Sequence, residues 1–97
     1  MKKKSTVPLC VANGATFLDA QYLEGWAHRI NVDRLSLSSS CNCILGQLEG
    51  GFVEGKEKLG LGFRSGLSYG FDTFAIWRYS WLTKEWKREI AKRMQAQ

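Results

Sequence analysis

The chain has 97 residues, 44% of them hydrophobic, a length and composition that fit one folded domain with a single core. Its net charge of +5 is concentrated at the two ends, because residues 2–4 and 84–93 hold eight basic and two acidic side chains. No apolar run approaches the roughly 18 residues of a membrane span or has signal-peptide length, so we expect no membrane contact and a cytoplasmic location.

The first predicted helix lies within residues 14–30. Thr16 followed by Asp19 has the form of an N-terminal capping box. We therefore expect residues 1–13 to be a flexible basic tail and residues 14–97 to be a single helical domain. The apolar side chains that recur at helical spacing are Ala15, Leu18, Tyr22, Trp26 and Ile30.

The middle of the chain changes character twice. Residues 31–40 favour a turn or a short extended connector, and a second helix is predicted from Ser40, with a kink or break at the double glycine 50–51. Leu45, Leu48, Phe52 and Leu59 can share its buried face with Cys41. Eight of the ten glycines fall within residues 46–70, which indicates loops or short helices. Their spacing narrowly misses a dinucleotide-binding motif and no buried strand precedes it, so no cofactor is expected.

A long C-terminal helix is the strongest predicted element. At the helical step of about 100° per residue, one stripe should pack on the core: Ala75, Tyr79, Leu82, Trp86 and Ile90. If the helix runs unbroken from Asp72, the opposite face carries Trp77, Trp81, Lys84, Arg88 and Lys92. A helix beginning at Thr83 would instead leave both tryptophans free to pack in the core. Trp and Arg together are typical of protein interfaces, so this strip is the predicted partner-binding site.

Three cysteines raise the question of a metal site. Cys10, His28, Cys41 and Cys43 are the right ligand types for structural zinc. The one-residue gap between Cys41 and Cys43 is tighter than the usual ligand spacing, so we expect scaffold cysteines and no metal. A cysteine nucleophile with His28 as base is a weaker alternative, and the absence of a paired-carboxylate site, a nucleophile elbow or a phosphate loop argues against an enzyme.

The string CILGQLEGGFVEGKEKLGL, with GW upstream and YGFD and LTKEWKREI downstream, resembles a set of short uncharacterised proteins of actinobacteria and their phages. The shared order implies a phage origin, and it implies no activity. The matching positions are Gly25, Trp26, Asp33, Leu35, Cys43, Ile44, Leu45, Gly46, Gln47, Gly50, Leu59, Gly60, Leu61, Gly70, Phe71, Leu82, Thr83, Trp86 and Ile90. Gln47 is the polar member of this scaffold, and it is expected to bond a neighbouring backbone group or to face a partner.

Together these patterns predict a mainly α domain of three or four helices, with a glycine-rich loop segment and a long C-terminal helix. We expect a non-enzymatic, phage-type accessory protein in the host cytoplasm that binds and modulates a host protein. The alternative is a small nucleic-acid-binding regulator whose C-terminal helix contacts phosphates. Its candidate contacts are Lys84, Lys87, Arg88, Lys92 and Arg93.

Overall fold

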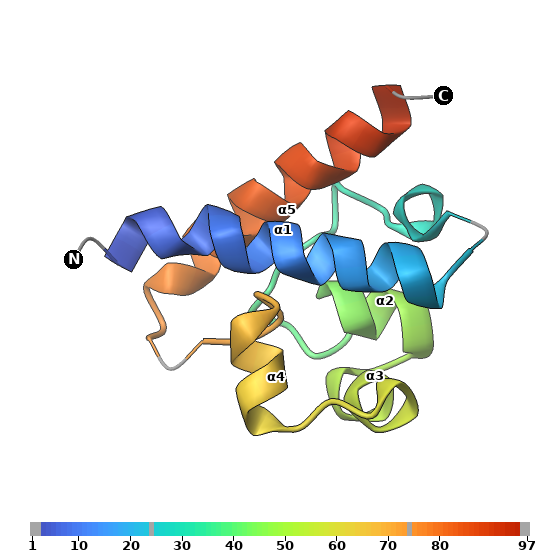
Figure 1. Cartoon of the computed structure of the whole chain (residues 1–97), viewed down its shortest axis with the longest axis horizontal. Coiled ribbons are helices and arrows are strands. Elements are labelled where there is room, and N and C mark those ends of the chain that lie inside the picture. Colours follow the sequence, from blue (N-terminus) through green and yellow to red (C-terminus); the bar gives the residue numbers. More distant parts are fainter. Residues whose placement is uncertain (1–2, 24, 74, 96–97) are drawn as a thin grey trace.

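Two long helices, α1 (Lys3–Gln21) and α5 (Arg78–Gln95), cross and pack against each other (Figure 1). The computed structural model describes residues 3–23, 25–73 and 75–95. Within them the remaining elements are a 3-10 helix and three short α-helices: η1 (Trp26–Arg29), α2 (Ile44–Glu49), α3 (Phe52–Leu59) and α4 (Phe63–Ser68). This part of the chain has no strand, so the mainly helical fold is confirmed, with five α-helices rather than three or four. None of these helices is long and apolar enough to span a bilayer.

The structure corrects the prediction that residues 1–13 form a flexible tail. Residues 3–13 form the first part of α1, and Val7 and Val11 are buried in the core. Their spacing of four continues the stripe of Ala15 and Leu18, so folding this segment buries apolar surface that a tail would leave in water. Residues 1 and 2 lie outside the described part of the chain. Because α1 starts so early, Thr16 lies in its interior and cannot cap its N-terminus.

The first helix also ends earlier than predicted. α1 stops at Gln21, and Gly25 adopts a left-handed φ of 91° directly before η1. Trp26 and Ile30 are nevertheless buried, because η1 turns them back toward the helix pair. The double glycine divides the second predicted helix: Gly50 ends α2 with a φ of 94°, and α3 begins after Gly51.

Gln47 holds the connector, residues 30–43, against α2. Its side-chain oxygen accepts a hydrogen bond from the Asn31 N–H at 2.7 Å, and its Nε2 donates to the carbonyls of Asn31 and Asn42. The connector consists of turns, as the sequence predicted. Of the two roles foreseen for Gln47, the structure therefore supports bonding to neighbouring backbone groups.

Trp86 on α5 is the centre of the core. Its side chain is fully buried, stacks on Phe71 with ring centroids 5.4 Å apart, and meets Trp26 edge to face at 5.7 Å. The indole N–H donates a 2.7 Å hydrogen bond to the Gly70 carbonyl, so the buried polar atom is satisfied. The aromatic contacts join α5 to η1 and to the segment that follows α4.

Gly14 allows this arrangement to close. A Cβ built on Gly14 would lie 1.9 Å from the backbone oxygen of Tyr69 and 3.1 Å from the Trp86 ring. Residues 69–71 therefore lie directly against the backbone of α1. Gly70, with a φ of 73°, turns the chain at the same place.

We predict that Gly14→Ala destabilises the fold by about 1 to 3 kcal/mol, because the new methyl group meets backbone that cannot move aside without displacing Trp86. The matched control is Gly66→Ala in α4, where the nearest atom to a built Cβ is Lys56 Cε at 3.8 Å. That change should be neutral or stabilise the protein by about 0.5 to 1 kcal/mol, through higher helix propensity. Urea denaturation of both variants checks this, and equal effects would contradict the close approach at Gly14.

Candidate binding surface along α5

The predicted tryptophan strip is divided in the structure. α5 begins at Arg78, so Trp77 lies immediately before the helix, where its side chain is 65% exposed next to an 80% exposed Ile76. Trp81, in the first turn, is partly buried and packs on the core. The predicted unbroken helix from Asp72 is therefore wrong, and of the two tryptophans only Trp77 presents its side chain largely to solvent.

Asp72 sets this late start. Its carboxylate accepts a hydrogen bond from the Thr73 N–H at 2.8 Å and another from the Tyr79 hydroxyl at 2.7 Å. These bonds fix a turn ahead of α5, and Ala75 is bonded within it through the Thr73 hydroxyl. Burial, together with the bond to Asp72, raises the pKa of Tyr79 to about 12, so its hydroxyl stays protonated as a donor at neutral pH. Phe74 lies outside the described residues.

Four cations extend outward from α5: Lys84, Lys87, Arg88 and Lys92. Lys84 and Lys87 form no ion pair with any residue in the described part of the chain. Arg88 lies 3.9 Å from Glu85, and Lys92 lies 3.2 Å from Glu89. The carboxylates of both pairs are largely buried, but the side chains of Arg88 and Lys92 are 74% and 69% exposed, so all four cations are accessible to an anionic partner.

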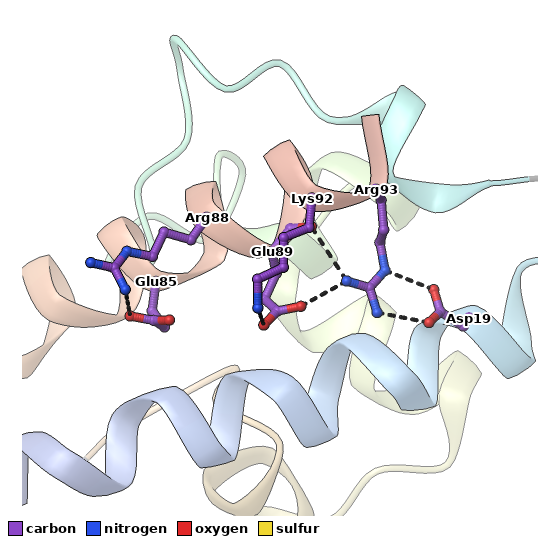
Figure 2. Close-up of polar contacts among 6 residues, drawn as sticks. All are labelled: Asp19, Glu85, Arg88, Glu89, Lys92 and Arg93. Atoms are coloured by element: carbon purple, nitrogen blue, oxygen red, sulfur yellow. Dashed lines mark hydrogen bonds and ion pairs between the residues drawn. The ribbon is translucent and has the colours of Figure 1, made fainter. Parts of the chain in front are cut away.

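Arg93 points inward instead. Figure 2 shows its guanidinium reaching from the end of α5 to Asp19 on α1, with bonds of 3.0 and 2.8 Å to the two carboxylate oxygens. A third nitrogen binds Glu89 at 2.7 Å, and the group lies 5.5 Å from the centre of the Trp26 ring. The Trp26 indole also donates to Asp19. Arg93 is thus a link between the long helices, which corrects its predicted role as a phosphate contact.

The hydrogen bonds from Arg93 hold the pKa of the Asp19 carboxyl below its usual value, and the same pairing raises the pKa of Arg93. Sequence patterns gave no signal for this pair, whose members are 74 positions apart.

Of the hollows beside α5, one near each end of the helix is relevant to binding, and neither of these two was predicted. The N-terminal hollow, of about 470 Å³, lies between the first turns of α5 and the serines of the connector. Its lining includes Ser36, Ser38, Ile76, Ser80, Thr83 and Lys84. The sequence signal that could have marked this place is the apolar pair of Ile76 and Trp77 just before the helix.

The C-terminal hollow, of about 270 Å³, lies between the last turns of α5 and the start of the connector. It is almost wholly apolar, with Ile90 and Ile30 as floor and a single cation, Lys87, at its edge. Val32 and Met94 reach it from opposite sides, and both are partly exposed. Val32 and Met94 are far apart in the sequence and line one hollow only in the folded chain, so no local pattern could have predicted it.

Of the three cysteines, Cys43 has a structural role, whereas Cys41, predicted to share a buried face, does not lie in the core. Cys43, rather than Ser40, caps α2: its buried thiol accepts a hydrogen bond from the Gly46 N–H at 3.3 Å and approaches the Ser40 carbonyl at 3.6 Å. Burial raises the pKa of this thiol, which disfavours the reactive thiolate. Cys41 and His28 are exposed and Cys10 is half-buried. Across residues 3–23, 25–73 and 75–95, no three His, Cys, Asp or Glu side chains come close enough to hold a metal, so the alternative zinc set is not assembled.

No family model, curated protein or solved structure matches the chain.

We predict that Asp19→Asn lowers the free energy of unfolding by about 1 kcal/mol at pH 7, a figure reduced for the half-exposed carboxylate. The folded-state pKa of Asp19 lies below its unfolded value, so this stabilisation is present above about pH 4 and is lost as pH falls through the folded pKa. The gap between wild type and variant should close as the pH approaches 2. Urea denaturation as a function of pH measures it.

Asp33→Asn is the control, since Asp33 is exposed and its carboxylate has no ion pair within the described residues. A gap for Asp19→Asn that stays constant down to pH 2, or an equal effect of Asp33→Asn, would contradict a role for the Asp19 carboxylate in linking α1 to α5.

Proposed function

We propose that the protein is a small, non-enzymatic accessory protein of phage type that binds a host protein through the surface around Trp77 and thereby modulates it. The observation that carries this proposal is the adjacent exposure of Ile76 and Trp77 at the start of a helix whose outward side is cationic. The phage assignment rests on the sequence resemblance across residues 25–90.

An exposed apolar pair of this size favours a protein partner. Large apolar side chains in water have an unfavourable free energy that burial in an interface removes, and Trp is among the residues most often found as an interface anchor. The N-terminal hollow lies next to Ile76 and could receive an apolar side chain from the partner. Lys84 at its edge, with Arg88 and Lys92 farther along, suits a partner surface that is acidic around an apolar pocket.

The outward cations also support a second candidate, a nucleic-acid-binding regulator. Lys84, Lys87, Arg88 and Lys92 could contact phosphates, and Trp77 could stack on a base. This interface has one cation fewer than the sequence suggested, because Arg93 is held by Asp19 and Glu89. The two candidates differ in salt dependence, which is steep for phosphate contacts and shallow for an apolar interface.

We predict that the tagged protein retains one host protein from bacterial host lysate after nuclease treatment, and that Trp77→Ala abolishes most of this retention. Loss of a central Trp anchor typically costs about 2 kcal/mol or more, or roughly thirtyfold in affinity. Quantitative mass spectrometry of parallel pull-downs, with and without nuclease and at low and high salt, measures the effect.

Val53→Ala is the matched control, because Val53 is an exposed apolar residue on α3 with 59% of its surface in solvent. Equal retention of the host protein by wild type and by Trp77→Ala would contradict the proposed binding surface. If the enriched proteins are nucleic-acid-associated and are lost after nuclease treatment, the result would favour the second candidate, a nucleic-acid-binding regulator.

A further inference from the structure

We infer that the partner segment received by this surface is an acidic amphipathic helix of about four turns, lying along the edge of α5 that faces the connector. The inference rests on the proposed function and extends it, because it names the chemistry of the partner and adds the C-terminal hollow to the binding surface.

The two hollows belong to one edge of α5. At about 100° per residue, five side chains fall within about 80° of one another: Ser80, Lys84, Lys87, Ala91 and Met94. The first two line the N-terminal hollow and the last three line the C-terminal hollow. At about 1.5 Å per residue this edge is roughly 21 Å long, which is the length of a helix of about 14 residues.

The connector forms the opposite wall along this edge. Val32 lines the C-terminal hollow and Ser38 lines the N-terminal hollow, so the connector runs antiparallel to α5. The Leu37 N–H donates a 3.0 Å hydrogen bond to the Thr83 hydroxyl, which fixes the wall to the helix. The two hollows share no lining residue, and we call them, with the edge of α5 between them, the groove. Each hollow has α5 as one wall and the pinned connector as the other, so both are largely preformed and a ligand need not order them on binding.

Charge complementarity selects the occupant. The groove is apolar at both ends, through Ile76 and Met94, and carries Lys84 and Lys87 between them. A matching helix has apolar side chains near its two ends and carboxylates in its middle, spaced three or four residues apart to meet two lysines that are themselves three apart. A second copy of this chain is disfavoured, since two molecules of net charge +5 would bring these lysines together. A nucleic acid would leave the apolar ends uncovered.

The test is selection of a displayed library of helical peptides of about 16 residues, randomised on one face, against the immobilised full chain. Enriched sequences should place Asp or Glu in the middle and apolar residues near both ends. A synthetic winner should bind, by fluorescence anisotropy, at least about tenfold more weakly to Lys87→Glu and to Met94→Asp than to wild type. Val32→Asp, on the opposite wall, should weaken it similarly, whereas Val53→Asp on α3 should leave binding unchanged.

Each outcome is decisive, once thermal melts show that the variants are folded. If enriched peptides fail to bind the Trp77→Ala variant yet bind the Lys87→Glu and Met94→Asp variants as tightly as wild type, the inference of a helix in the groove fails, while the proposed Trp77 surface stands. If no peptide is enriched, or the enriched peptides ignore all of these changes, the inference of a helical partner fails, and the pull-down with Trp77→Ala decides the proposed Trp77 surface separately. If a single-stranded oligonucleotide of about 20 nucleotides binds more tightly than any enriched peptide, and Lys87→Glu lowers its affinity, this edge of α5 binds nucleic acid and the inference is overturned.

Discussion

The rest of the structure depends on the buried hydrogen bond between the Trp86 indole and the Gly70 carbonyl. A donor inside an apolar core must find an acceptor, and here the acceptor is a backbone oxygen of the chain that follows α4. That chain can reach Trp86 only by lying against α1, where Gly14 provides the space. One polar requirement thus fixes three segments relative to one another, and the stacked Phe71 ring fills the core around the bond.

This arrangement also determines which side of α5 faces solvent. Leu82, Trp86 and Ile90 turn inward. Lys84 and Arg88 are each two residues from a core position, about 160° around the helix, and therefore turn outward. At its far end the helix is held a second time, by Arg93 and its two carboxylate partners on α1 and α5 (Figure 2). A helix fixed at its middle and near its end presents Trp77, Lys84 and Lys87 in a defined geometry. Preorganisation of this kind reduces the entropy lost on binding.

The sequence was informative where a pattern is local. The period of the last helix correctly identified Leu82, Trp86 and Ile90 as core, and the double glycine correctly indicated a break. It misled where a local signal was overridden by packing. Thr16 and Asp19 have the form of a helix N-terminus, yet α1 runs through them from Lys3, because folding the preceding segment buries Val7 and Val11 in the core.

The proposed binding surface was only partly predictable, for a related reason. The outward cations follow from helical periodicity. Trp77 lies before α5, and the start of that helix depends on side-chain bonds from Asp72 that a projection does not contain. The link between Asp19 and Arg93 and the two hollows arise between segments tens of positions apart. No period in the sequence encodes such contacts, so they become visible only in the folded chain.

The most direct test of this account is the hydrogen exchange of the indole N–H groups, followed by NMR and assigned with single Trp→Phe variants. We expect the Trp86 N–H, which is buried and bonded to the Gly70 carbonyl, to exchange more slowly than the indole N–H groups of Trp26 and Trp77. Trp26, bonded to Asp19 at 2.8 Å, should follow, and the exposed Trp77 should exchange fastest. A protected Trp77 together with a rapidly exchanging Trp86 would contradict both the proposed core and the proposed surface.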